Sequence, residues 1–241
     1  MTKSMVFITD WLKKQNAETQ TNGFVFGLSG GVDSAVVAGL SKLASPDKTL
    51  GIIMPCKSDP QDAVDAQAVA DLLQLKTITV DLSDDYSFLA EKLSSSVLLE
   101  PSKVTLANIK PRLRMMVLYF YANLYNRLVV GTGNRDERYV GYFTKWGDGG
   151  ADIMPIAHLS KAEVRKMAQE LKIPKHIIEK PPSAGLWLNQ TDEQEMGFSY
   201  QVLDQYLKGE QIPDKARKRI EHLHRTSRHK LSLPPIIEEE H

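Results

Sequence analysis

The feature that most constrains this chain of 241 residues is a repeated alternation between short apolar runs and longer segments with helical periodicity. Four runs have the length and composition of buried strands, at 24–28, 49–54, 76–81 and 127–131. Helical patterns precede and separate them, at 4–20, 34–44, 60–74, 84–98 and in a longer segment that ends near 125. This alternation predicts a parallel sheet covered by helices on both faces, and right-handed crossovers then make the fold doubly wound.

The last third of the chain continues the pattern more weakly. We expect a short strand at 152–156, a helix at 160–171 and a charged, helical C-terminal tail at 213–226. The prediction is therefore a doubly wound, mostly parallel, Rossmann-like α/β fold in which residues 1–241 form a single domain.

Composition excludes several classes of function. Thirty basic and thirty acidic side chains cancel, which argues against a nucleic-acid binder with a large basic surface. No apolar run approaches the length of a membrane span, and the N-terminal sequence MTKSMVFITDW lacks a signal-peptide pattern. The single cysteine, Cys56, excludes an internal disulfide and a metal site built from several cysteines. We expect a cytoplasmic enzyme with no membrane and no nucleic-acid partner.

Polar residues follow three of the predicted strands, at 29–34, 55–59 and 132–137. Ligands of open parallel sheets bind outside the carboxyl ends of the strands, where the strand order reverses. If the order is third, second, first, fourth, the first and fourth strands flank that point. The loops that carry Asp33 and Glu137 would then face each other.

The turn after the first strand, Gly27-Leu28-Ser29-Gly30-Gly31, also fits the G-x-S-x-G nucleophile elbow of hydrolases. That interpretation needs an earlier strand for the oxyanion hole, and only a helix precedes this one. It also needs an acid and a histidine in order after the serine, and no histidine follows a strand convincingly. A lysine-containing P-loop and the dinucleotide motif G-x-G-x-x-G do not fit the turn either.

What remains is S-G-G-V-D-S between a buried strand and a helix. Gly30 and Gly31 allow backbone amides to approach an anion, and the start of the helix adds partial positive charge. Asp33 suits a phosphate site only if Mg²⁺ bridges the two, because carboxylate oxygens are preferred Mg²⁺ ligands. The simpler alternative is that Asp33 or Ser29 caps the helix.

This turn resembles the pyrophosphate-binding motif of the ATP-pyrophosphatase (PP-loop) group, which adenylates its substrates. The runs at 131–156, 108–115 and 181–193 extend the resemblance over nearly the whole chain, to ammonia-dependent NAD synthetases. The resemblance implies ATP-dependent amidation of nicotinic acid adenine dinucleotide (deamido-NAD) with ammonia, through an acyl-adenylate, to give NAD, AMP and pyrophosphate. At 241 residues, we expect the chain to contain no glutaminase domain. Ammonia is therefore expected free or from a separate protein.

The resemblance also implies roles for individual residues. Asp33 and Glu137 would bind Mg²⁺, and Asp33, Glu137, Lys161 and Asp152 would form the catalytic set, with Asp152 a candidate acceptor for the proton of ammonium. The expected ATP contacts are Gly27, Leu28, Ser29, Gly30, Gly31, Val32, Asp33, Ser34, Thr132, Lys161 and Ser183. The expected deamido-NAD contacts are Arg112, Lys145, Asp152, His229 and Lys230.

Two positions depart from the family pattern. Pro111 starts or kinks the helix there, which affects the direction of Arg112; Arg114, two residues on, points to another face. Asp136 replaces a small residue and would be either a second carboxylate near the metal or an exposed one.

The long helix ending near 125 carries an apolar stripe, Leu106 to Leu124, that is core or continues into a partner helix. The resemblance, rather than the stripe, implies a homodimer with the dinucleotide bound across the interface. Two alternatives remain for the activity. One is another PP-loop adenylating enzyme, either tRNA-modifying or GMP-forming, and the other is a non-catalytic adenine-nucleotide module.

Overall fold

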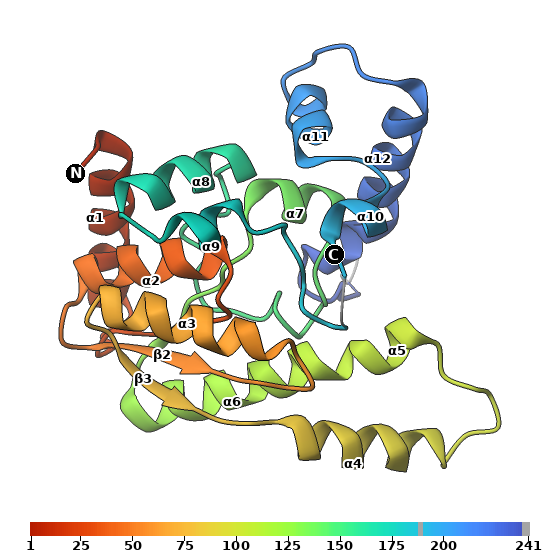
Figure 1. Ribbon diagram of the computed structural model, residues 1–241, viewed down its shortest axis with the longest axis horizontal. Coiled ribbons are helices and arrows are strands. Elements are labelled where there is room, and N and C mark those ends of the chain that lie inside the picture. The colour runs from red at the N-terminus through yellow and green to blue at the C-terminus, as the bar shows by residue number, and fades with distance from the viewer. Residues whose placement is uncertain (188–189, 238–241) are drawn as a thin grey trace.

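A computed structural model describes residues 1–187 and 190–237, so Leu188 and Asn189 of the run at 181–193 lie outside the described residues (Figure 1). The predicted strands form one parallel sheet in the order β3-β2-β1-β4, which confirms the reversal between the first and fourth strands. The strands are β1 (Phe24–Gly27), β2 (Thr49–Ile53), β3 (Lys76–Thr79) and β4 (Leu128–Val129).

Helices flank the sheet and continue beyond it. Those that precede or follow its strands are α1 (Lys3–Glu18), α2 (Val32–Ala44), α3 (Pro60–Leu72), α4 (Ser83–Ser94), α5 (Lys103–Ala107), α6 (Ile109–Tyr125) and α7 (Arg135–Val140). The later ones are α8 (Lys161–Glu170), α9 (Lys175–Glu179), α10 (Asp192–Met196), α11 (Tyr200–Leu207), α12 (Asp214–Ser227) and the 3-10 helix η1 (Arg228–Lys230). Within residues 1–187 and 190–237, no helix is long and apolar enough to cross a bilayer.

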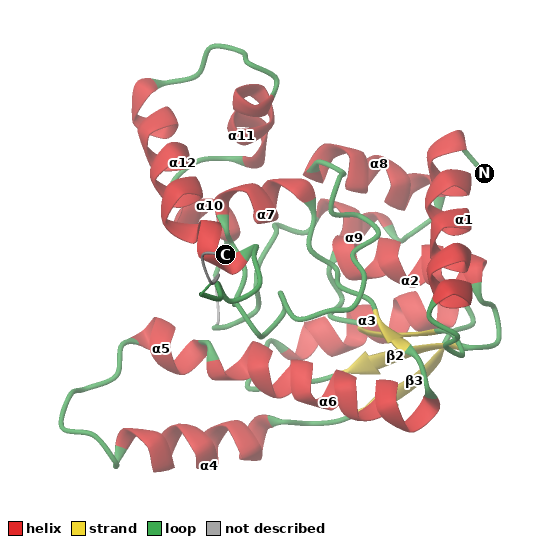
Figure 2. Ribbon diagram, turned by 180° about the vertical axis from the view of Figure 1, so that it is seen from behind, coloured by secondary structure: helices red, strands yellow, loops and turns green. Residues whose placement is uncertain are grey.

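The alternation of side chains in β1 explains the two layers of helices. Phe24 and Phe26 point to a core formed with α1, α2, α3 and α8, whereas Val25 points to a core formed with α4 and α6. Figures 1 and 2 show these two groups of helices on opposite sides of the strands. Both faces are therefore covered, as the near-continuous apolar run predicts.

A third apolar cluster lies outside the sheet. It joins α7, α10, α11 and α12 through Val140, Met196, Leu203 and Ile220, all of which are buried. Figure 1 shows α11 and α12 standing away from the sheet while α7 and α10 lie between them and it. The sequence predicted α12 but missed the short helices α7, α9, α10 and α11.

The predicted strand at 152–156 is wrong. In the described part of the chain only a single parallel bridge, Val130 to Ile153, forms there. Pro155 has no N–H to donate, so a longer ladder cannot continue through it. The bridge nevertheless places the start of the following segment beside β4.

The apolar stripe of α6 faces two ways. Leu113 is buried against the sheet, whereas Met116, Phe120 and Leu124 are 61%, 62% and 59% exposed. Pro111 is the third residue of α6, where a backbone N–H would have no partner within the helix, so the missing N–H costs the helix no hydrogen bond. Met116, Phe120 and Leu124 therefore do not belong to the core of this chain.

An ion-pair cluster fastens the end of α9 to α3. Lys180 donates to Asp62 Oδ1 at 2.8 Å and to Asp65 Oδ2 at 2.6 Å. Gln61 also donates to Asp65, which is only 2% exposed. Burial acts to raise the pKa of Asp65, but the bonds from Lys180 and Gln61 outweigh it and lower the pKa.

Asp65→Asn tests this cluster. A carboxyl with a lowered pKa stabilises the fold above its unfolded pKa of about 3.9, and this contribution disappears as the pH falls further. We expect the variant to unfold about 1–3 kcal/mol more easily at pH 7, with the gap closing below about pH 4. Asp71→Asn is the matched control, because Asp71 accepts from Gln67 with the same spacing on α3 but is exposed. Equal unfolding curves for the two variants in urea would contradict the prediction.

Candidate active site

The turn after β1 is built around glycine and two serines. Gly30 has a φ of +78°, and a Cβ there would come within 2.3 Å of the Asp62 carbonyl oxygen, so the position requires glycine. The Ser34 hydroxyl accepts from the Ser29 N–H at 3.2 Å and donates to the Gly31 carbonyl at 2.9 Å. The turn is thus closed from inside, with the start of α2 directly behind it.

The helix-capping interpretation of this turn is wrong. Gly31 is the N-cap of α2, and no side chain caps it; Asp33 lies inside the first turn instead. The Ser29 hydroxyl lies 3.0 Å from that of Ser34, and no histidine of the described residues hydrogen-bonds to it. Ser29 therefore lacks the general base that a nucleophilic serine needs.

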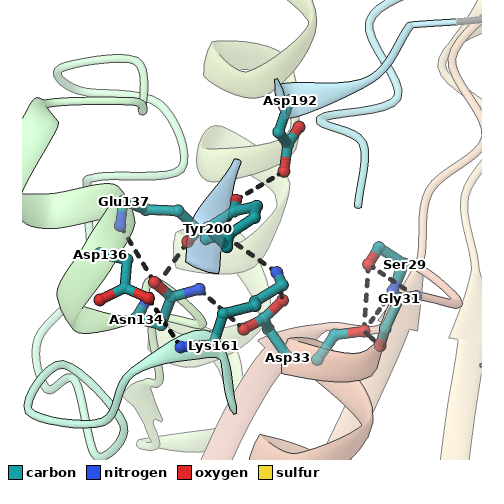
Figure 3. A network of polar contacts seen from close by, with 10 residues as sticks. Ser29, Gly31, Asp33, Asn134, Asp136, Glu137, Lys161, Asp192 and Tyr200 are labelled. Atoms are coloured by element: carbon teal, nitrogen blue, oxygen red, sulfur yellow. Dashed lines mark hydrogen bonds and ion pairs between the residues drawn. The ribbon is translucent and has the colours of Figure 1, made fainter. Parts of the chain in front are cut away.

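Lys161 connects the two carboxylates that the strand order predicts to face each other (Figure 3). Its Nζ lies 2.5 Å from Asp33 Oδ2 and 3.3 Å from Glu137 Oε1, although the three residues come from α8, α2 and α7. Lys161 is 3% exposed. Burial acts to lower its pKa, but Asp33 and Glu137 outweigh burial and raise it, so the amine stays charged.

The surroundings of Glu137 shift its pKa strongly. Burial raises its pKa to about 7, with Lys161 acting in the opposite direction and Asp33 in the same one. Asn134 holds both acids: its Nδ2 donates to Asp33 Oδ1 at 3.0 Å, and it forms a capping box with Glu137 at the start of α7. The sequence analysis missed Asn134, although its spacing of three from Glu137 is a capping signal.

The carboxylate of Asp136 is buried and binds outside the centre that Asp33, Lys161 and Glu137 form. It is fully buried and accepts from the backbone N–H of Lys161 at 2.8 Å, so it holds the first residue of α8 in place. Arg135 lies beside it and also pairs with Asp204 at 2.6 Å. The expectation that Asp136 is exposed is therefore wrong. Its carboxylate lies near the proposed metal ligand Glu137 in the sequence, but it binds the backbone of Lys161.

Two further residues reach the centre from α10 and α11, and the sequence analysis missed both. The Tyr200 hydroxyl lies 2.8 Å from Asp192 Oδ2 and 3.3 Å from Glu137 Oε1 (Figure 3). Asp192 is 3% exposed, and burial raises its pKa; its Oδ1 has no hydrogen-bond partner among the described residues. Asp192 belongs to the run at 181–193, but no periodicity marked it as a site residue.

The residues expected to contact deamido-NAD fall into two places. Arg112 donates to the Lys145 carbonyl at 3.4 Å, and Lys145 donates to the His229 carbonyl at 2.5 Å, so these three lie together. Lys230 lies beside them, with its amine on the carbonyls of Gly141 and Phe143.

Asp152 is separate from this group. It accepts from the Tyr119 hydroxyl at 3.0 Å and from the Val129 N–H at 2.8 Å. Its hydrogen bonds thus connect it to α6 and β4, and its expected contact with deamido-NAD stays a prediction.

Thr132 lines a pocket of about 40 Å³ that borders Glu137. The other lining residues are Gly133, Arg138, Phe143, Asp148, Gly149 and Met154. Ser183 is exposed and accepts from the Gly185 N–H, in the segment that follows Lys180. Arg114 donates to the Met54 carbonyl and to Ser58 Oγ.

The donor set fits a hard divalent cation. Asp33 and Glu137 both lie within 3.3 Å of the Lys161 amine, so the two carboxylates are close together and would be the residues that hold such an ion beside that amine. Mg²⁺ is bound by one or two carboxylates and completes its shell with water and phosphate oxygens. Among the residues described, no three His, Cys, Asp or Glu side chains are grouped closely enough to hold a metal ion by themselves.

The glycine-rich turn, the facing carboxylates and the buried lysine at the carboxyl edge of a parallel sheet define a nucleotide-binding class of α/β enzyme. Residues 4–234 match the family model described as NAD synthase. The chain is 50% identical over 229 residues to the NH(3)-dependent NAD(+) synthetase of Carboxydothermus hydrogenoformans, covering 95% of this chain and 94% of that one. It is 45% identical to the protein of the same name from Alkaliphilus oremlandii, covering 97% and 96%. The chain belongs to the NAD synthase family.

Solved structures agree with this assignment. The NMN synthetase from Francisella tularensis matches with a TM-score of 0.92 and 41% identity, covering 98% of each chain. The NH3-dependent NAD synthetase from Campylobacter jejuni matches with a TM-score of 0.79 and 27% identity, again over 98% of each chain. The comparisons do not favour a tRNA-modifying or GMP-forming enzyme or a non-catalytic module.

Proposed function

We propose that the chain is a ligase that amidates deamido-NAD with ammonia, using ATP, and releases NAD, AMP and pyrophosphate. The observation that carries the proposal is the centre formed by Asp33, Lys161 and Glu137 beside the glycine-rich turn, in a chain of this family. The substrate carboxylate attacks the α-phosphorus of ATP and pyrophosphate leaves. Ammonia then attacks the carboxyl carbon of the acyl-adenylate, and AMP leaves.

Each part of the centre has a task in the first step. The amides and hydroxyls at 29–34 bind phosphate oxygens, and the start of α2 adds its partial positive charge. Lys161 stabilises the negative charge that grows on the departing pyrophosphate. Asp33 and Glu137 would hold Mg²⁺, which when bound neutralises phosphate charge.

The remaining site residues are proposed to hold the substrates. Thr132 and Ser183 contact ATP, while Arg112, Lys145, His229 and Lys230 contact the deamido-NAD. Holding both substrates together makes their reaction effectively unimolecular. Asp152 is kept as the candidate proton acceptor for ammonium, in a place supported by two hydrogen-bond donors.

We also propose that the enzyme works in the cytoplasm. A single buried cysteine leaves no internal disulfide to form, which suits a reducing compartment.

The direct test is incubation of the chain with ATP, Mg²⁺, ammonium and deamido-NAD. Chromatography should show NAD, AMP and pyrophosphate formed in equal amounts. No NAD should form when EDTA removes the metal. A chain that binds ATP but forms no amide product would sink the proposal.

A mononucleotide substrate is the second candidate. It is favoured by the likeness to the Francisella tularensis NMN synthetase, which exceeds that to the Campylobacter jejuni NAD synthetase in both identity and TM-score. The amide-forming chemistry is the same, and only the adenylate half of the substrate differs. Competition between nicotinic acid mononucleotide and deamido-NAD in one assay gives the ratio of their kcat/KM values and decides between them.

Asp33→Asn tests the metal-binding role. The amide keeps the size of the side chain but removes the charge, so we expect kcat/KM to fall by about 10²–10³ with little change in melting temperature. Asp10→Asn is the control, because Asp10 also pairs with a lysine, Lys13 at 3.1 Å, but on the exposed surface of α1. Unchanged Mg²⁺-dependent turnover in the Asp33 variant would remove this residue from the metal site.

We propose that two chains associate through the exposed face of α6, formed by Met116, Phe120 and Leu124. Phe120→Glu should convert a dimer into a monomer, because it would place a charge in an apolar contact, as sedimentation or light scattering would report. Phe7→Glu is the control: Phe7 is 67% exposed but lies on α1, across the sheet from α6. A monomeric wild-type chain, or a Phe120 variant that remains dimeric, would contradict this interface.

A further inference from the structure

Lys110 is a buried lysine whose contacts are all neutral. It is 4% exposed, and its Nζ donates to the Lys57 carbonyl at 3.2 Å and to the Leu186 carbonyl at 2.7 Å. The ring of Tyr86 lies 4.9 Å away, and none of the described carboxylates pairs with the amine. A buried charge without a counter-ion is costly, so the position invites a reason beyond packing.

The first carbonyl belongs to the loop that follows β2. Lys57 has a φ of +50°, a left-handed conformation that a lysine rarely adopts. Arg114, one turn after Lys110 on α6, donates to the Met54 carbonyl at 3.2 Å and to Ser58 Oγ at 2.9 Å. Lys110 and Arg114 thus hold the 54–58 loop from one face of α6.

The second carbonyl belongs to the 180–187 segment. Lys180 fixes the start of this segment to α3, and Lys103 lies 4.1 Å from the ring of Trp187 near its end. In the middle, a Cβ on Gly185 would lie 3.6 Å from Asp62 Oδ2, and the carbonyl of Asp62 backs the phosphate turn at Gly30. Segment, loop and turn therefore surround one region at the carboxyl edge of the sheet.

We propose that Lys110 is a positioning residue for ATP: it ties the 54–58 loop to the 180–187 segment, so that the two sides of the nucleotide site are held at a fixed separation before ATP binds. The inference rests on the proposed function, since it takes ATP to be the ligand between them. Lys110 itself need not touch the nucleotide, because both of its donated bonds go to backbone carbonyls.

Lys110→Met tests this, with Lys42→Met as the matched control. Lys42 also donates to two backbone carbonyls, those of Pro46 at 2.7 Å and Gln74 at 2.9 Å, but at the opposite edge of the sheet. We expect Lys110→Met to raise both the Kd and the KM for ATP about tenfold, as when the competent arrangement falls to about a tenth of the population. The value of kcat and the KM for the second substrate should stay within about twofold of wild type, and Lys42→Met should alter none of them.

Hydrogen exchange of the ligand-free protein gives a readout that does not need ATP. Lys110→Met should speed exchange in peptides that cover 54–58 and 180–187, and Lys42→Met in neither. Unchanged exchange, unchanged ATP affinity, or a lower kcat at unchanged KM would overturn the inference. A wild-type chain that binds no ATP would instead overturn the proposed function. If Lys110→Met does not fold, Lys110→Gln, which is shorter but keeps a donor, undergoes the same comparisons.

Discussion

The site depends on the charge of Lys161 being placed between Asp33 and Glu137. An ammonium that is 3% exposed would be strongly destabilising alone, and the two carboxylates compensate it only because they converge from two other helices. Three acids, Asp33, Glu137 and Asp192, surround this one cation, and burial raises the pKa of Glu137 and Asp192. The centre therefore has more acidic than basic side chains, a balance that a bound divalent cation would change in the favourable direction.

The topology of the sheet brings these groups together. Because β1 and β4 are neighbours, the turns that follow them meet, although Asp33 and Glu137 are far apart in the sequence. The single bridge between Val130 and Ile153 then directs the chain back, so that Asp136 can receive the first amide of α8 and bring in Lys161. Strand order sets the two acids opposite each other, and one buried carboxylate sets the lysine between them.

Features that depend on local periodicity and on strand ends could be predicted from the sequence. The apolar runs predicted β1 to β4, and the polar residues that follow two of these strands predicted that Asp33 and Glu137 face each other. Tyr200 and Asp192 could not be predicted in this way, since they lie on α10 and α11, which pack through a separate cluster and carry no strand-end signal. The burial of Asp136 depends on its contact with the backbone N–H of Lys161, which is distant in the sequence, so no local pattern predicts it. The prediction of a strand at 152–156 was wrong because the segment is mostly apolar but contains Pro155. It forms a single bridge, at Ile153, instead of a ladder.

Three lysines near the site, Lys161, Lys180 and Lys110, differ in the charge of their partners. Lys161 pairs with the carboxylates of the centre, and Lys180 pairs with carboxylates behind the phosphate turn. Lys110 donates only to backbone carbonyls, one in the 54–58 loop and one in the 180–187 segment. The partners of Lys161 and Lys180 are therefore acidic, and those of Lys110 are neutral. This arrangement suits a ligand whose two ends differ in polarity. The charged end would bind together with a divalent cation, and the neutral end would use its donors and acceptors. A nucleoside triphosphate has this form, so the polarity of these three lysine sites agrees with the nucleotide ligand proposed above.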